Sequence, residues 1–279
     1  MPEDVTGHEL DRSIRAELSS LAAPAAKEVA RHLVMAGRLL DEDPETAYLH
    51  ASAARERAAR LAGVREAVGL SAYRTGRFAE ALAELRTVRR LTGSTEHLPV
   101  MADCERGLGR PERALAMAAE PEANQLDAAG RAEMLIVAAG ARADLGELDA
   151  AVVMLQVPQL RSTAKEPWIA RLRSAYADAL EAVGRTEEAR AWLERAAEAD
   201  IDGSTAAADR LDELDGTLFV DLEDDGDDED DGADEDGGAD EDGDDSGERV
   251  GEEPDSGEPA GDEPVDGAPP VDEVDGADD

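Results

Sequence analysis

Apolar residues recur over the first 200 residues at the three- and four-residue spacing of amphipathic helices. Residues 10 to 21 show the first such pattern, with four large apolar residues along one side of a helix: Leu10, Ile14, Leu18 and Leu21. Residues 25 to 40 and 44 to 61 continue it as a helical hairpin, and Asp43-Pro44 supplies an N-cap followed by proline at the first helical position. The N-terminal part is therefore expected to be helical.

Residues 64 to 91 contain the clearest unit of the chain, two short amphipathic helices joined at Gly76-Arg77. Gly76 suits a helix C-terminus, where a positive φ is often required. Gly69 is a small residue in the first helix, at a point where a neighbouring helix could approach closely. Ala81 is small and lies early in the second helix, and Leu85 follows one turn later. The segment predicts a tightly packed helical hairpin.

The same hairpin pattern recurs three more times towards residue 200. The turn glycines Gly76, Gly109, Gly146 and Gly184 are 33, 37 and 38 residues apart, and alanines follow them with the same spacings: Ala81, Ala114, Ala151 and Ala189. The longer spacings indicate inserted loops near residues 120–131 and 158–167. A single hairpin of this kind cannot bury its apolar face alone, so the repeats are expected to stack.

This periodicity resembles that of the tetratricopeptide repeat (TPR), which has a Gly in helix A, a Gly turn, then Ala and a large apolar residue four positions on. Arg65 departs from the pattern, because a Trp is usual there. The resemblance covers roughly residues 44–200 and implies an all-α, right-handed solenoid of about four repeats. Over its N-terminal two-thirds the chain also resembles TPR proteins of high-GC bacteria, a resemblance that implies no activity.

Four regions follow from this pattern. Residues 1–43 are predicted to form N-terminal helices, and residues 44–200 the repeat domain. Residues 201–216 are predicted to form a polar capping helix that starts at Ser204. Residues 217–279 are predicted to be a disordered acidic tail, because Asp, Glu, Gly and Pro cannot bury enough apolar surface to offset the entropy of ordering.

Charge is distributed unevenly in this chain of net charge −40. From residue 221 onward 30 acidic residues face Arg249 alone, which leaves 38 acidic and 27 basic residues in the body. Direct nucleic-acid binding is disfavoured because such a chain repels phosphate. The acidic N-terminus does not resemble a secretory signal, and the longest uncharged run, of 11 residues, is too short to span a membrane. A cytoplasmic protein is expected.

Candidate catalytic and metal sites are weak in this sequence. Gly107-Leu-Gly109 lacks the third glycine of a nucleotide-binding loop and the strand before it. The acidic run lacks the Glu that an EF-hand loop needs at its last position. Cys104 is the single cysteine and is expected to be a buried, inert thiol. We therefore expect no enzyme activity, no cofactor and no metal site.

The repeat register places a mixed set of polar residues on the inner side of the A helices, which we call the inner face. These positions include Glu66, Tyr73, Arg74, Asp103, Arg106, Glu133, Gly140, Arg171 and Asp178. The Lys and Asn set of TPR domains that capture a C-terminal carboxylate is missing. Because Tyr and Arg dominate interface hot spots, the candidate partner-binding residues are Tyr73, Arg74, Arg106 and Arg171. The alternative, that these are ordinary solvated helix faces, stays open.

Two functional hypotheses follow. In the first, the chain is a non-enzymatic scaffold or adaptor that binds a protein segment on its concave face. In the second, it is a regulatory module whose acidic tail competes for a basic surface, as a nucleic-acid mimic on a partner or as an autoinhibitory segment on the solenoid's own arginines. An enzyme has no set of residues to support it.

Overall fold

The computed structural model describes residues 1–201, 203 and 205–214, and these residues form twelve α-helices and two short 3-10 helices without any strand. The expected all-α fold is confirmed for this part of the chain. None of the described helices combines the length and apolar character that crossing a bilayer requires. The predicted disordered tail, residues 217–279, lies outside the described residues.

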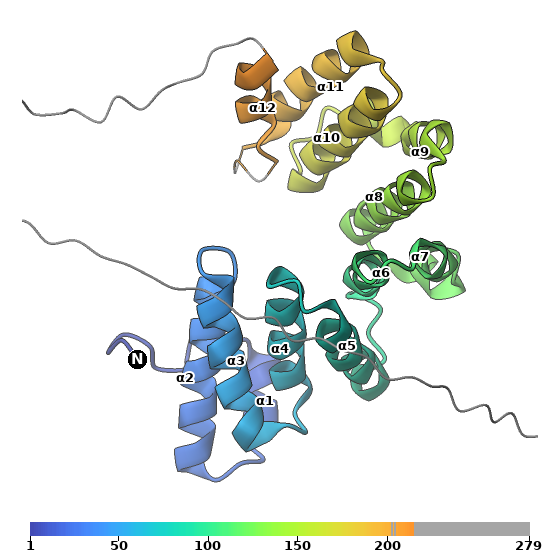
Figure 1. The fold of residues 1–279 in the computed structure, drawn as a ribbon. Coiled ribbons are helices and arrows are strands. Elements are labelled where there is room, and N and C mark those ends of the chain that lie inside the picture. The colour runs from blue at the N-terminus through green and yellow to red at the C-terminus, as the bar shows by residue number, and fades with distance from the viewer. Residues whose placement is uncertain (202, 204, 215–279) are drawn as a thin grey trace, which may run out of the picture. The chain divides into compact units, whose positions relative to one another are not determined.

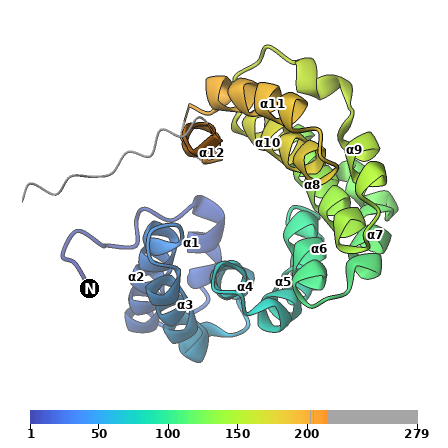
Figure 2. The same ribbon diagram turned by 45° about the horizontal axis from the view of Figure 1, so that its top comes forward.

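Five helical hairpins follow one another along the chain (Figure 1). They pair α2 (Ala23–Leu39) with α3 (Pro44–Ala58), α4 (Ala62–Arg74) with α5 (Phe78–Thr92), α6 (Leu98–Gly107) with α7 (Pro111–Ala118), α8 (Ala128–Asp144) with α9 (Leu148–Leu155), and α10 (Pro167–Ala182) with α11 (Thr186–Ala199). Helix α1 (Arg12–Leu18) precedes them and α12 (Ala207–Leu214) follows. Figure 2 shows α4, α6, α8 and α10 on the inner side of this stack, with α5, α7, α9 and α11 outside them. The hairpins form the predicted α-solenoid.

The predicted turn glycines close the hairpins by one shared mechanism. Gly76, Gly109, Gly146 and Gly184 have φ values of 72°, 70°, 77° and 77°. The residue after each glycine donates its backbone N–H to a carbonyl five residues back, as Arg77 does to Ala72 at 2.7 Å and Arg185 to Leu180 at 2.9 Å. This is the Schellman arrangement, which satisfies the last carbonyls of the first helix. The turns therefore depend on a left-handed residue that glycine supplies without strain.

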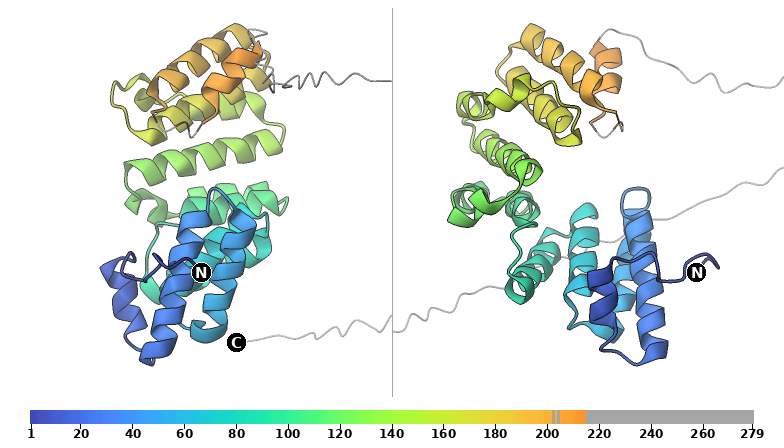
Figure 3. Two further views of the ribbon diagram at one scale, coloured as in Figure 1. Left: turned by 90° about the vertical axis from the view of Figure 1, so that its left-hand side faces the viewer. Right: turned by 180° about the vertical axis from the view of Figure 1, so that it is seen from behind.

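The hydrophobic core is divided along the stack. One cluster runs from α4 to α8 and a second from α8 to α12, while smaller clusters join α1, α2, α3 and α4. The four repeat alanines belong to the two large clusters and are at most 2% exposed: Ala81, Ala114, Ala151 and Ala189. Figure 3 shows the hairpins stacked one on the next from two further sides. Each hairpin thus buries its apolar side against its neighbours, as the repeat pattern predicts.

The structure refines several predicted boundaries. The two inserted segments contain the 3-10 helices η1 (Pro121–Gln125) and η2 (Pro158–Arg161). The capping helix α12 begins at Ala207, three residues after the predicted start. The predicted boundary at residue 44 falls between α2 and α3, which pack against each other, so an additional hairpin precedes the four whose turns are marked by glycine. The division into domains stays a prediction.

Candidate partner-binding surface

The centre of the inner face carries a polar network that connects three consecutive A helices. The Tyr73 hydroxyl on α4 donates to Asp103 Oδ2 on α6 at 2.6 Å. Arg106, one turn further along α6, donates from Nη1 to Asp103 Oδ1 at 2.7 Å and from Nε to Asp144 Oδ2 on α8 at 2.7 Å. The network brings together Tyr73 and Arg106, two of the four predicted site residues.

Gly140 explains how the Arg106 side chain can lie across α8. A Cβ atom at Gly140 would be only 2.8 Å from Arg106 Cζ, so the guanidinium rests against the glycine backbone. From this position Arg106 reaches both Asp103 and Asp144. The contact explains why the repeat register has a glycine at an inner position of α8.

The network holds its groups in defined protonation states. Burial, together with the hydrogen bond to Asp103, raises the pKa of the Tyr73 hydroxyl well above its ordinary value, so it remains a hydrogen-bond donor. The hydrogen bond to Asp144 raises the pKa of Arg106. At neutral pH the cluster therefore contains a neutral phenol and an arginine cation that is paired with Asp103 and Asp144.

Arg74 and Arg171 lie in separate ion pairs outside this network. Arg74 Nη2 is 2.8 Å from Asp41 Oδ1, and Arg171 Nη2 is 2.7 Å from Glu133 Oε2 on α8. Both guanidinium groups are substantially exposed. Burial raises the pKa of Glu133 although Arg171 opposes this shift. The structure thus gives each predicted residue an acidic partner within the chain, and partner binding by all four stays a prediction.

The first and the last of the described helices, α1 and α12, contact the two ends of the inner face. At the N-terminal end, the Gly63 backbone N–H donates to Glu17 Oε2 from α1 at 3.2 Å. At the C-terminal end, Arg210 of α12 pairs with Glu181 Oε2 at 2.9 Å and also with Asp178. The part of the inner face between these contacts belongs to α4, α6, α8 and the start of α10.

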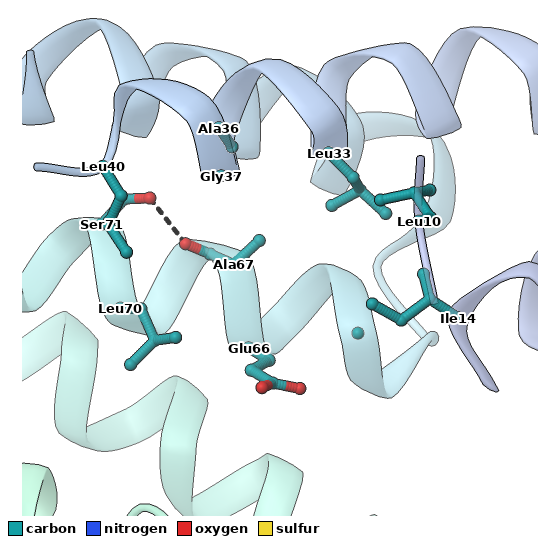
Figure 4. A pocket seen from close by; sticks show the side chains of 11 residues that line it. Leu10, Ile14, Leu33, Ala36, Gly37, Leu40, Glu66, Ala67, Leu70 and Ser71 are labelled. Atoms are coloured by element: carbon teal, nitrogen blue, oxygen red, sulfur yellow. Dashed lines mark hydrogen bonds between the residues drawn. The ribbon is translucent and has the colours of Figure 1, made fainter. Parts of the chain in front are cut away.

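An apolar pocket of about 200 Å³ lies at the N-terminal end of the inner face, between α1, α2 and α4 (Figure 4). Its walls include Leu10, Ile14, Leu33, Leu40, Ala67 and Leu70. Glu66 also lines the pocket, and its Oε1 lies 3.1 Å from His97 Nε2. Sequence analysis missed this pocket because it depends on how α1 packs against two hairpins. The inner position of Leu70 was the available signal.

The metal-ligating and nucleophilic side chains of the described residues are dispersed or buried. No group of three or more His, Cys, Asp or Glu side chains in the described part of the chain could hold a metal ion. Burial raises the pKa of the Cys104 thiol to about 12, so the thiolate that would act as a nucleophile is not formed at neutral pH. His32 and His50 approach each other with 3.0 Å between their Nδ1 atoms, but this pair lies between α2 and α3. The histidine pair is thus separate from the polar network of the inner face.

Comparison with solved structures identifies a similar fold. A crystal structure of a thermophilic TPR protein from Thermus thermophilus matches with a TM-score of 0.51 and 21% sequence identity, covering 66% of this chain and 98% of that chain. This similarity supports a TPR-like fold. No family model matches the sequence, and a search of curated proteins finds no match.

Proposed function

We propose that this chain, with its TPR-like fold, is a non-enzymatic scaffold that binds a protein segment along the inner face from α4 to the start of α10. The observation that carries the proposal is the position of the Tyr73–Asp103–Arg106 network beside an apolar pocket on that face. An aromatic residue, a fixed arginine and an apolar pocket are the features that concentrate binding energy in protein interfaces.

The ion pairs of the inner face leave room for exchange with a partner. The Arg74–Asp41 pair is exposed, with 44% and 81% of the two side chains accessible. Exposed pairs of this kind contribute only about 0–1 kcal/mol, so a carboxylate of a partner could replace Asp41 at little cost. Arg171, which is 52% exposed, offers a second such cation. We therefore propose a partner segment that carries acidic residues.

The apolar pocket would supply the other half of recognition. Its volume of about 200 Å³ suits one large apolar side chain of a partner rather than a cofactor. Leu70 and Glu66 from α4 line it, and Tyr73 and Arg74 lie one turn further along the same helix. We propose that one apolar anchor of the partner enters this pocket while acidic residues follow towards Arg74 and Arg171.

Matched variants test this proposal. A partner captured from the native host and then purified is titrated against the full chain, against Leu70→Gln and Arg74→Glu, and against controls on α5. Leu91→Gln and Arg90→Glu are the controls, because Leu91 and Arg90 are exposed and allow the same chemical changes on an outer helix. The inner-face variants should weaken binding at least about tenfold, the loss expected when a desolvated anchor is removed.

The tail-centred alternative predicts different behaviour. If the tail provides the affinity, deleting residues 221–279 abolishes binding, and raising salt does so even with the tail present, because long-range attraction is screened at about 3 Å in 1 M salt. If the tail is autoinhibitory, the same deletion strengthens binding. Equal affinity of the inner-face variants and their controls would reject the scaffold proposal in its present form.

A further inference from the structure

Several cations of the last two repeats and of α12 pair with carboxylates: Arg142, Arg171, Arg185, Arg190 and Arg210. Four others instead line one pocket of about 610 Å³ between the loop after α9 and the helices α10 and α11: Arg161, Lys165, Arg173 and Arg195. None of these four forms an ion pair within residues 1–201, 203 and 205–214, and Glu198 is the one acidic residue in the pocket lining.

Arg173 holds the pocket together without losing its charge. Its Nε donates to the Leu160 carbonyl at 3.1 Å, its Nη2 to the Ser162 carbonyl at 2.6 Å, and its Nη1 to the Arg195 carbonyl at 2.7 Å. These bonds fasten the loop to α11 through neutral carbonyl groups. Burial, together with the nearby Arg195, lowers the pKa of Arg173. The guanidinium therefore brings a cation into the pocket that forms no ion pair within the described residues, and Glu198 is the acidic residue that opposes the shift of its pKa.

The remaining cations surround this centre. The Arg195 guanidinium lies 4.5 Å from the ring centroid of Trp192, which fixes its direction. Arg161, at the end of η2, and Lys165, in the segment before α10, are exposed and line the same pocket. Four cations and one carboxylate leave an excess of positive charge in a chain whose net charge is −40. Such an excess stabilises a bound anion.

In the first glycine-turn repeat, the arginine at the position equivalent to Arg173 has a carboxylate partner. Arg65 and Arg173 both lie 16 residues before the repeat alanine, Ala81 or Ala189. Arg65 Nη1 pairs with Glu84 Oε2 at 2.6 Å, and Arg55 Nη1 approaches Glu84 Oε1 at 3.1 Å. The residue equivalent to Glu84 in the last repeat is Trp192. The arginine at this repeat position therefore pairs with Glu84 in the first glycine-turn repeat. In the last repeat Trp192 replaces that carboxylate.

We infer that the pocket formed by Arg161, Lys165, Arg173 and Arg195 binds a small multivalent anion of the phosphate class. Guanidinium groups recognise phosphate through paired N–H donors, and the lysine adds a compact charge. The Ser162 and Thr163 residues of the loop also line the pocket and could donate further hydrogen bonds. The site lies away from the inner face, since Arg173 is about 200° around α10 from Arg171. This inference is independent of the proposed scaffold function.

Pyrophosphate is the probe for the test, and Trp192 is the reporter. The sequence has two tryptophans, so Trp168→Phe leaves Trp192 as the single tryptophan fluorophore of the full chain. Titration of this variant with pyrophosphate, with NaCl added to a matched blank to keep ionic strength constant, should give a saturable change in fluorescence. Calorimetry on the unmodified chain should give one site per chain.

Two double variants decide whether the pocket is responsible. Arg161→Gln with Lys165→Gln removes two exposed loop cations that make no hydrogen bond within the described residues. It should weaken pyrophosphate binding at least about tenfold, the factor expected from one charge-assisted hydrogen bond. Lys27→Gln with Arg113→Gln makes the same change in net charge at exposed positions on α2 and α7 and should leave affinity unchanged. Equal circular dichroism of the variants confirms that both are folded.

Three results would overturn the inference. The first is the absence of saturable binding at constant ionic strength. The second is an equal loss of affinity in the pocket and control variants, which would mean that only net charge matters. The third is tighter binding of a synthetic peptide with the sequence of residues 227–236 than of pyrophosphate, which would make the pocket a docking site for acidic protein segments.

Discussion

Gly69 of α4 lies so close to Leu85 of α5 that a Cβ atom on Gly69 would be 2.8 Å from Leu85 Cδ2 and 2.9 Å from its Cγ. Leu85 is completely buried, so it has little room to move away. The contact fixes the distance between the two helices of the first glycine-turn hairpin. It also places Gly69 where the sequence predicted that a neighbouring helix approaches closely.

Gly69→Ala should therefore destabilise the fold by about 1–3 kcal/mol, because an extra methyl forces side chains or backbone to shift. Gly37→Ala is the matched control: Gly37 lies within α2, and a Cβ there would have no atom within 4 Å. It should instead stabilise by up to about 1 kcal/mol, the helix-propensity gain of Ala over Gly. Denaturant midpoints measure both effects. Similar midpoints for the two variants would contradict the packing described for α4 and α5.

The hydrogen bond between Tyr73 and Asp103 should couple α4 to α6. A double-mutant cycle with Tyr73→Phe and Asp103→Asn should give a coupling energy of about 1 kcal/mol, typical of a partly buried hydrogen bond. A cycle of Tyr73→Phe with Asp41→Asn serves as the control, since Asp41 pairs with Arg74 and not with Tyr73. That cycle should be additive within about 0.5 kcal/mol. Equal coupling energies in both cycles would contradict the hydrogen bond between Tyr73 and Asp103.

Glu105 on α6 is buried to 1% exposure and pairs with Arg86 Nη2 at 2.7 Å and with Arg110 Nη1 at 3.4 Å. Arg86→Met should destabilise by about 2 kcal/mol or more, because it leaves a buried carboxylate with one weaker partner. Arg89 lies on α5, as Arg86 does, and pairs with the partly exposed Glu120. Arg89→Met should therefore lower the free energy of unfolding by less than about 1 kcal/mol. Urea unfolding of the two variants gives the comparison, and a larger loss for Arg89→Met would refute it.

The histidine pair between α2 and α3 should make stability depend on pH. Burial lowers the pKa of both His32 and His50 below the ordinary value of 6.5, and the charge of His50 lowers that of His32 further. At these two sites the unfolded chain then binds more protons than the folded one below about pH 6.5, so their contribution to stability falls as pH drops through this range. Unfolding free energies measured from about pH 7.5 to 5.5 should fall less steeply in His50→Gln. If the pH dependence of the unfolding free energy were the same in His50→Gln, the lowered pKa values of the two histidines would be contradicted.

His97 should act in the opposite direction. Its hydrogen bond to Glu66 raises its pKa above 6.5, so its contribution is present below about pH 6.5 and is lost as pH rises through the folded-state pKa. His97→Gln should therefore make the loss of stability on acidification steeper, while His50→Gln makes it shallower. The opposite signs of the two variants provide an internal control against a general effect of removing a histidine.

Much of the fold follows from the sequence because it depends on local geometry. Each local feature can be recognised from the residue type at a single position. Gly76 indicates a left-handed turn, Ala81 a helix crossing and Leu85 the apolar side of a helix. The N-cap at Asp43 was visible for the same reason, and its side chain accepts from the Thr46 backbone N–H at 3.1 Å. Such features repeat with the hairpin, so periodicity reinforces them.

The pairing of charges could not be predicted in the same way. The repeat register placed Arg106 on the inner face, but it could not decide between the acidic residues within reach of a long, flexible side chain. Asp144 lies 38 residues away and becomes its partner only through the stacking of α6 on α8. Arg65, which breaks the TPR pattern, similarly finds Glu84 across the hairpin. The apolar pocket and the cation pocket depend on such long-range packing.

The division of the core gives α8 a special position. This helix contributes Met134, Val137 and Ala141 to the cluster that begins at α4, and Ala139 to the cluster that extends to α12. Releasing α8 would expose apolar surface on both sides at once, whereas α1 and α12 each border a single cluster. Backbone amides of α8 should therefore exchange with deuterium only through global unfolding, while those of the end helices exchange through local opening. We therefore expect α8 to be the last of the described helices to open.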